Sequence, residues 1–304
     1  MVTPHNDATP GTAAGSSAAS SGFLSSLRVV EIGGGMAAAF CGRLLADAGA
    51  DVLKVEPPDG DDLRRTGPYV GGAVHPERSI PYLALNAGKR SVSLDPTTAE
   101  GRERLEALLA AADVLVDDLG PGGAARWGID PADLGRRHPA LIHATISPFG
   151  HDGPFAGYQA EELTVYALGG LMYHIGAYDR EPLKHGPAQA ALVAGLNAAT
   201  GVVFALLERD RDGQGQRVDV SVQESVALLL SALELTQYAY TGGVARRDGK
   251  DGPGAEQHSA LRRRLCRAHW LRPRLGDDGA LPRLTRALES ASPPLPAAPA
   301  TALP

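Results

Sequence analysis

The sequence predicts an α/β fold organised around a doubly wound parallel sheet, on three observations. The stretch 29–58 reads as strand, glycine turn, helix and strand, which is the order of a right-handed βαβ unit. Short strands then alternate with helical segments as far as residue 147, as in a sheet covered by helices on both faces. Several strand segments, such as 29–32, are short apolar runs that suit strands buried on both faces.

Each part of this first unit has a local reason in the sequence. Residues 33–35 are glycines, which let the backbone turn sharply and approach a ligand closely. Residues 36–48 contain no proline and are rich in Ala and Leu, so they predict a helix, and Gly49 suits the left-handed position after its end. Residues 51–56 form the second strand. Free N–H groups and the helix dipole at the glycine turn favour an anion there.

The remaining elements follow from hydrophobic periodicity and from breaker residues. The polar, glycine-rich stretch 59–82 is expected to be a long surface loop. The segment 83–95 ends in a strand with apolar residues at alternate positions. Strands are also expected at 113–117, 141–147 and 217–221, and helices at 97–112, from 130 onward, and at 159–172, 188–209 and 225–240.

Composition narrows the class of protein. With 304 residues and 43% hydrophobic residues the chain can build a sizeable core, and its net charge of -6 argues against a general nucleic-acid binder. The two cysteines, Cys41 and Cys266, give no disulfide framework, which favours a cytoplasmic protein. No apolar run approaches 18 residues, so we expect no membrane-spanning segment. Residues 1–22 are rich in Ser, Ala, Gly and Thr and are expected to be a disordered leader.

The glycine turn allows one interpretation from spacing alone. Gly33, Gly35 and Ala38 match the Gly/Ala variant of the dinucleotide-binding fingerprint, and Glu56 stands where an acid would bind the ribose. An NAD-dependent oxidoreductase is therefore one alternative. A plain tight turn in an α/β sheet is another, because three consecutive glycines satisfy several spacings.

Six separated segments carry a more specific signal. They are LLADAGADVLKVEPP, GDDLRRTGP, LNAGKRSVSLD, ADVLVDDLGPG, RRHPALIHATISPFG and GQGQRVDVS. In these segments and their order the chain resembles the class III CoA-transferases, a family that includes formyl-CoA and carnitine CoA-transferases and α-methylacyl-CoA racemase. The resemblance runs from about residue 24 to about residue 247.

The resemblance implies a Rossmann-like large domain, a second, smaller domain that is incomplete here, and an interlocked homodimer. Its implied substrates are an acyl-CoA and a carboxylic acid, with coenzyme A (CoA) as cofactor and no metal, nucleic acid or membrane. The chain then divides into a disordered leader at 1–22, the CoA-binding domain at 23–210, a linker and the start of the small domain at 211–253, and an atypical Arg/Pro/Ala-rich tail at 254–304, expected to be disordered.

The resemblance also places the CoA site. The glycine turn would lie beside the CoA moiety, and the loop from Asp118 would hold the nucleotide end, with Arg126 as the main phosphate contact. The family usually has Asn-Phe where this chain has Asp118 and Leu119, so a ring that could stack on adenine is missing. Lys54 and Lys89 could add positive potential, although charged strand ends are usually solvated. The predicted CoA contacts are Gly34, Gly35, Met36, Leu94, Asp118, Leu119, Gly123, Arg126 and Trp127.

The chain departs from the family in its chemistry. A class III transferase uses an aspartate that attacks the thioester and becomes a mixed anhydride and then an acyl-enzyme thioester of CoA. Matching the segment GPAQAALVAG places Ala191 at that position, and no carboxylate occurs from residue 182 to residue 205. The nearest acids are Glu161 and Glu162, which we predict as catalytic candidates. A carboxylate desolvated beside a thioester could take a proton from the α-carbon, whereas the alternative is that both acids only favour the positive end of a helix.

The end of the chain is a second departure. Family members continue for roughly a hundred residues beyond this chain, whereas residues 261–286 are Arg-rich and the sequence from 290 is rich in Pro and Ala. We expect either a truncated or frame-shifted chain or a natural basic arm. Three functions remain open: a CoA-dependent enzyme that moves CoA between carboxylic acids or acts on the α-carbon of an acyl-CoA, an inactive CoA-binding relative, and an NAD-dependent oxidoreductase.

Overall fold

The computed structural model describes residues 22–177, 179–186, 188–230, 238–239 and 242. The predicted tail at 254–304 lies outside these residues, as do residues 1–21 of the predicted leader and most of 211–253 beyond residue 230. The second, smaller domain is therefore still a prediction.

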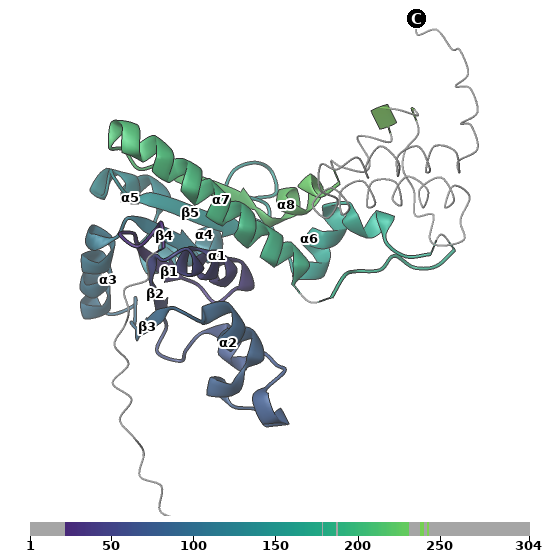
Figure 1. The fold of residues 1–304 in the computed structure, drawn as a ribbon, viewed down its shortest axis with the longest axis horizontal. Coiled ribbons are helices and arrows are strands. Elements are labelled where there is room, and N and C mark those ends of the chain that lie inside the picture. The colour runs from purple at the N-terminus through teal and green to yellow at the C-terminus, as the bar shows by residue number, and fades with distance from the viewer. Residues whose placement is uncertain (1–21, 178, 187, 231–237, 240–241, 243–304) are drawn as a thin grey trace, which may run out of the picture. The chain divides into compact units, whose positions relative to one another are not determined.

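The core of the described chain is a six-stranded sheet in which every pairing is parallel. The strand order is β3-β2-β1-β4-β5-β6, so the direction of progression reverses between β1 and β4. This arrangement confirms the predicted doubly wound fold (Figure 1). The strands are β1 Arg28–Ile32, β2 Asp51–Glu56, β3 Arg90–Ser93, β4 Val114–Asp117, β5 Ile142–Ser147 and β6 Arg217–Ser221.

Helices cover both faces of the sheet and complete two hydrophobic cores. On one face, α1 Met36–Asp47 and α7 Gln189–Asp212 pack against side chains such as Val29 and Ile142. On the other face, α3 Ala99–Ala111, α4 Gly120–Trp127 and α5 Pro131–Arg137 pack against the alternate set, which includes Leu115. Because side chains alternate along a strand, the apolar runs of the central strands supply both cores.

The last strand changes the predicted domain boundary. β6 pairs with β5 over its whole length, from His143 with Arg217 to Ser147 with Ser221. A boundary after residue 210 would cut this sheet, so the segment 211–253 does not begin with a linker to another domain. The strand belongs to the large domain because the long helix α7 returns the chain to the edge of β5, as a parallel crossover requires.

The helix α7 corrects the expectation that no apolar run approaches 18 residues. Within the described part of the chain it is long and apolar enough to cross a membrane by length and composition, with a mean hydropathy of 2.0 over 18 residues. The core helix of a globular protein meets the same criteria. The small side chains of α7 pack on α1 and the sheet, and Gly195 lies so close to α1 that an added Cβ would be 2.5 Å from the carbonyl oxygen of Ala37.

The stretch 59–82 is more regular than expected. It forms three short helical turns, η1 Asp62–Arg65, η2 Val70–Gly72 and η3 Pro76–Arg78, and leads into α2 Ile80–Asn86. Local caps explain the difference, because the side chains of Asp61, His75 and Ser79 each accept a hydrogen bond from a backbone N–H at the start of a turn.

The helices near the end of the described chain are shorter than expected. α6 spans Glu162–Leu168 and is separated from η4 Leu171–His174 by Gly170, whose φ is +86°. A left-handed glycine ends the helix there. α8 spans Val222–Leu228, and most of the helix predicted at 225–240 lies outside the described residues.

Candidate active site

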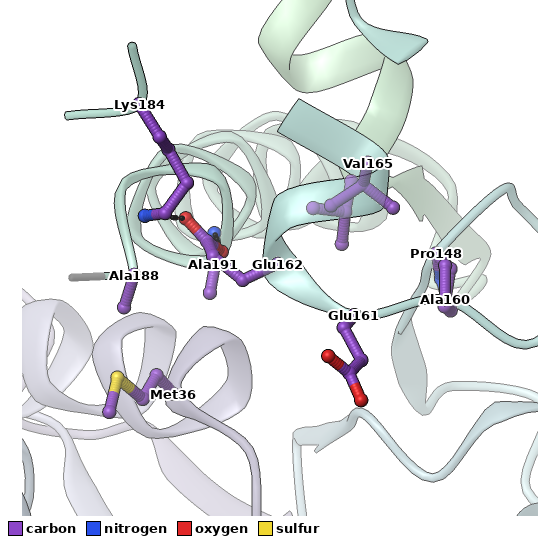
Figure 2. Close-up of a pocket in the computed structure, with 10 residues that line it drawn as sticks. Met36, Pro148, Ala160, Glu161, Glu162, Val165, Lys184, Ala188 and Ala191 are labelled. Atoms are coloured by element: carbon purple, nitrogen blue, oxygen red, sulfur yellow. Dashed lines mark hydrogen bonds and ion pairs between the residues drawn. The ribbon is translucent and has the colours of Figure 1, made fainter. Parts of the chain in front are cut away.

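A cavity of about 480 Å³ opens at the carboxyl edge of the sheet. Its size is typical of small-molecule sites, and the carboxyl edge is where open α/β sheets bind ligands. The chain reaches it from the start of α1, the segment after β5, the starts of α6, α7 and α8, and the irregular segment before α7 (Figure 2). The lining residues are Met36, Pro148, Ala160, Glu161, Glu162, Val165, Lys184, Ala188, Ala191 and Val222.

Glu162 is held at the start of α7. Its two carboxylate oxygens accept hydrogen bonds from the backbone N–H groups of Ala190 at 2.8 Å and Ala191 at 3.1 Å. The ammonium group of Lys184 lies 3.6 Å from the same carboxylate. Glu162 therefore caps α7 rather than its own helix, and both of its oxygens are already engaged.

The carboxylate of Glu161 lacks the hydrogen bonds and the ion pair that hold Glu162. Glu161 is exposed, and within the described part of the chain its carboxylate makes no hydrogen bond or ion pair. Figure 2 shows the two side chains diverging, with Glu162 directed at the start of α7 and Glu161 directed away from it. Of the two predicted catalytic acids, Glu161 is the one free to meet a ligand.

Ala191 presents a methyl group to the cavity, in the first turn of α7. The position before that helix, Ala188, has a left-handed backbone with φ of +60°, which is uncommon outside glycine. Because Ala191 lines the cavity, a side chain at this position faces the site, as the family resemblance implies for its nucleophile. A methyl group there offers no chemistry, so attack on a thioester from this position is excluded.

The glycine turn is occupied by a carboxylate of the chain itself. Asp118 accepts hydrogen bonds from the backbone N–H groups of Gly35 at 3.3 Å and Ala38 at 3.2 Å. A Cβ atom on Gly33 or Gly35 would overlap this carboxylate. Desolvation raises the pKa of Asp118 to about 6, against the lowering effect of the Ala38 hydrogen bond. Each carboxylate oxygen of Asp118 thus accepts one hydrogen bond from the turn.

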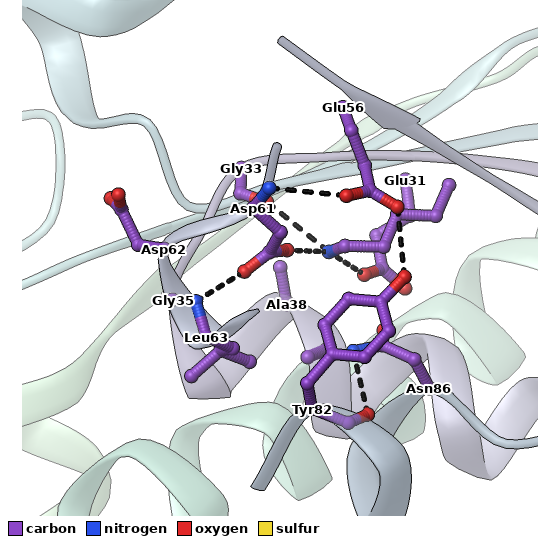
Figure 3. Close-up of polar contacts among 12 residues, drawn as sticks. Glu31, Gly33, Gly35, Ala38, Glu56, Asp61, Asp62, Leu63, Tyr82 and Asn86 are labelled. Atoms are coloured by element: carbon purple, nitrogen blue, oxygen red, sulfur yellow. Dashed lines mark hydrogen bonds and ion pairs between the residues drawn. The ribbon is translucent and has the colours of Figure 1, made fainter. Parts of the chain in front are cut away.

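A buried ionic network supports the turn from below (Figure 3). The ammonium group of Lys54 lies 2.7 Å from Glu31 and 2.6 Å from Asp61, and it donates to the carbonyl of Gly33 at 3.2 Å. Lys89 reaches the second oxygen of Glu31 at 2.7 Å. Although burial lowers the pKa of Lys54, Glu31 and Asp61 outweigh it and raise the pKa overall. The expectation that Lys54 and Lys89 are solvated was wrong, because neutralising partners are buried with them.

Glu56 bears on the NAD interpretation. Its carboxylate takes two hydrogen bonds from Arg64, at 2.6 and 2.9 Å, and one from the hydroxyl of Tyr82 at 2.8 Å. Burial would raise the pKa of Glu56, but these hydrogen bonds lower it to about 2. An acid committed to an arginine and a tyrosine is not available to a ribose, so this part of the dinucleotide fingerprint does not function here.

Most of the other predicted CoA contacts lie in or beside the hydrophobic core rather than at the cavity. Leu94 is a core residue that packs with the helices of the second face, and this explains its position without a ligand. Leu119 and Trp127 pack partly against the same core, and Gly123 is buried close to Leu119. Arg126 is exposed on the last turn of α4. Of the nine contacts predicted, Met36 alone lines the cavity.

Two further features were not anticipated. Lys184 and Ala188 line the cavity because the segment before α7 folds back over it, which no local pattern signals. Behind the loop after β4, the carboxylate of Asp117 contacts the Nε2 atom of His143 at 2.6 Å and accepts from the N–H of Leu119 at 3.2 Å. Among the described residues, no group of three or more His, Cys, Asp or Glu side chains is placed to hold a metal ion.

Comparison with known proteins decides the family. A profile of CoA-transferase family III matches residues 24–302. The chain belongs to CoA-transferase family III. The match extends past residue 247, where the resemblance was expected to end, so the change in composition does not mark the limit of the family sequence.

Individual relatives agree with this assignment. The chain is 35% identical over 236 residues to the succinyl-CoA:(R)-benzylsuccinate CoA-transferase subunit BbsE of Thauera aromatica, covering 77% of the chain and 57% of the relative. It is 34% identical to the succinyl-CoA–D-citramalate CoA-transferase of Chloroflexus aurantiacus, covering 74% and 55%. A crystal structure of a CAIB/BAIF family protein from Brucella suis matches with a TM-score of 0.69 and 37% identity, covering 74% and 60%. The chain thus spans a little over half the length of these curated relatives.

Proposed function

We propose that this family III chain binds the CoA thioester of a carboxylic acid, with the acyl group in the cavity at the carboxyl edge of the sheet. The observation that carries the proposal is the convergence of Met36, Glu161 and Ala191 on one cavity, from the starts of three separate helices. Relatives named for succinyl-CoA support a carboxylic acid as the second substrate. A cytoplasmic homodimer, as predicted from the sequence, is part of the same proposal.

Calorimetry with CoA and with NAD tests the class of ligand. We expect CoA to bind and NAD to give no signal, because Glu56 is committed to Arg64. Arg126→Ala should weaken CoA binding by about 1.5–3 kcal/mol if a charge-assisted hydrogen bond to phosphate is lost. Arg104→Ala, at an exposed arginine paired with Glu100 on α3, is the matched control and should leave binding unchanged. Tight NAD binding with silent CoA would contradict the proposal.

A second candidate is a CoA-binding chain that does not itself perform covalent transfer. The specific observation is Ala191, because neither Glu161 nor Glu162 lies on α7, the helix from which the family nucleophile would act. The name of one relative, a CoA-transferase subunit, fits a chain that works beside a second chain carrying the aspartate. In that case CoA binds but turnover requires the partner.

Trapping separates these candidates. The protein is incubated with an acyl-CoA, treated with hydroxylamine or borohydride, and mapped by mass spectrometry. We expect no modification at residues 186–195 in the parent chain. We expect Ala191→Asp to create a trappable carboxylate there, since the new side chain would face the cavity. Modification of the parent at Glu161 would assign catalysis to that acid instead.

The deuterium exchange of the α-proton of an acyl-CoA tests the racemase-like alternative. A general base contributes about 10²–10⁴-fold, so Glu161→Gln should reduce exchange by that factor if Glu161 is the base. If exchange is unchanged in both Glu161→Gln and Glu162→Gln, neither acid acts as the base.

A further inference from the structure

The start of α1 is the natural anion position of this fold. The first N–H groups of a helix have no partner within the helix, and in α/β sheets that position commonly receives a ligand phosphate. Here two of these groups, on Gly35 and Ala38, donate to the Asp118 carboxylate. The position that the glycine turn creates is therefore filled from within the chain.

The geometry of the turn is adapted to this internal carboxylate. A side chain at Gly33 or Gly35 would collide with Asp118 itself, so both glycines make room for the aspartate. The carbonyl of Gly33 is held from the other side by Lys54 at 3.2 Å. The donors of the turn are thus tied to the half-buried Asp118, and its carbonyl to the buried Lys54.

The loop that carries Asp118 is also anchored on its other side. Asp117 accepts from the N–H of Leu119 and contacts His143 on β5. A ligand phosphate arriving at the turn would have to displace a carboxylate whose neighbours on both sides are tied down. It would also meet a like charge at contact distance, which opposes binding.

We infer that Asp118 is a specificity-determining residue whose carboxylate closes the start of α1 to ligand phosphates. The inference takes from the proposed function only the statement that the ligand carries phosphates. It follows that the pyrophosphate of CoA lies away from the glycine turn, and that the turn contributes shape rather than charge. Met36, the next residue, then faces the cavity without a phosphate beside it.

Titration of the full chain with inorganic pyrophosphate at pH 7.5 tests this assignment. Binding is measured by calorimetry, and its location by the amide resonances of Gly35 and Ala38. Asp118→Ala removes both the charge and the bulk, and should bind pyrophosphate at least about tenfold more tightly than the parent, with shifts at both amides. Asp118→Asn removes the charge and keeps the shape. Asp118→Asn should show a smaller gain in pyrophosphate affinity. If the alanine variant fails to fold, this variant alone tests whether the Asp118 carboxylate excludes phosphate.

Asp130→Ala is the matched control. Asp130 also accepts from two backbone N–H groups, those of Ala132 and Asp133 at the start of α5, at 3.1 Å each. Its removal should leave pyrophosphate binding at the turn as in the parent. Equal affinity in the parent and both Asp118 variants, or parent binding that shifts Gly35 and Ala38, would overturn the inference.

The same samples titrated with CoA keep the two proposals separate. A parent chain that fails to bind CoA contradicts the proposed function, while the pyrophosphate comparison still decides the role of Asp118. A parent that binds CoA supports the proposed function, and the role of Asp118 is again decided by the pyrophosphate comparison alone, because CoA beside Met36 can shift the neighbouring amides without a phosphate at the turn.

Discussion

Lys54 is a charged side chain near the middle of a buried strand. The stability of the folded protein therefore depends on the acidic partners that neutralise it. Removing one member of a buried ion pair costs about 3–5 kcal/mol because the other charge is left uncompensated. We expect Lys54→Met to lower the free energy of unfolding by that amount, since Glu31 and Asp61 would both lose their cation. Urea unfolding measures the change, read from the midpoint at constant slope.

Arg90→Met provides the comparison for that measurement. Arg90 on β3 pairs at 2.6 Å with Asp51, which lies on the same strand as Lys54, but both side chains are about half exposed or more. Exposed pairs contribute about 0–1 kcal/mol, so this variant should unfold close to the parent. Similar losses in the two variants would show that the Lys54 network is not what stabilises this region.

Glu162 accepts hydrogen bonds at the start of α7, whereas its neighbour Glu161 makes none within the described residues. Substituting each in turn therefore tests whether Glu162 caps the helix. Glu162→Ala removes the acceptor of two N–H groups at the start of α7 and should cost about 0.5–2 kcal/mol of stability. Glu161→Ala removes no hydrogen bond and should stay within about ±0.5 kcal/mol. Thermal unfolding of both variants checks this, and an equal effect would contradict the role of Glu162 as the cap.

Some residues predicted for the site line the cavity and others lie elsewhere, for identifiable reasons. Glu162 and Ala191 come from distant segments, and only the family resemblance linked them. Lys54 did carry a signal that was not used: a lysine inside an apolar strand needs an acid, and Glu31 stands beside it in register. No local pattern in the sequence shows that the carboxylate of Asp118 turns back to α1.

Helix α7 is held against α1 by small residues, and this packing can be tested at two glycines. Gly195→Ala would place a methyl group 2.5 Å from the carbonyl of Ala37, a backbone atom that cannot move aside cheaply. We expect a loss of about 1–3 kcal/mol. Gly135 on α5 has no atom within 4 Å of an added Cβ, so Gly135→Ala should stabilise by about 0.4–1 kcal/mol. Stabilisation by both changes would contradict the close approach.

At the level of elements, the buried strands were the easiest to predict and the capped turns the hardest. β1 and β4 have apolar runs that only a strand covered on both faces needs. The stretch before α2 looked irregular because its order comes from single caps such as that of Ser79, which donates in turn to the carbonyl of Leu63 at 2.6 Å. Such contacts join residues 16 apart and have no periodicity.

The stability of the whole molecule should depend on pH through Glu56. Its folded pKa, about 2, lies below the ordinary value of 4.5, so the ionised form is favoured by folding. The contribution is present above pH 4.5 and is lost as pH falls toward 2. At about 1.4 kcal/mol per pKa unit this amounts to about 3 kcal/mol. Unfolding of Glu56→Gln should show a correspondingly flatter decline in acid, and an unchanged decline would contradict the assignment.

The contribution of Asp118 to stability changes with pH in the opposite direction to that of Glu56. The folded pKa of Asp118, about 6, lies above the ordinary 3.8, so folding favours the neutral form. Its contribution is full below pH 3.8 and is lost as pH rises through 6, again about 3 kcal/mol. The stability of Asp118→Asn relative to the parent should therefore increase by about that amount between pH 4 and pH 7. A difference that stays constant with pH would show that Asp118 does not titrate in this range.

Enclosing two lysines with Glu31 and Asp61 has a consequence for behaviour on heating. The desolvation penalty of buried ions falls as temperature rises, because the hydration of charged groups has a strongly negative entropy. The network beneath the glycine turn should accordingly contribute more at 60 °C than at 25 °C, relative to an apolar replacement of the same volume. Added salt should hardly weaken it, since the Lys54 and Glu31 side chains are about 1% and 0% exposed and ions cannot enter between them. The ligand edge of the sheet would then keep its shape in conditions that loosen the surface ion pairs of the helices.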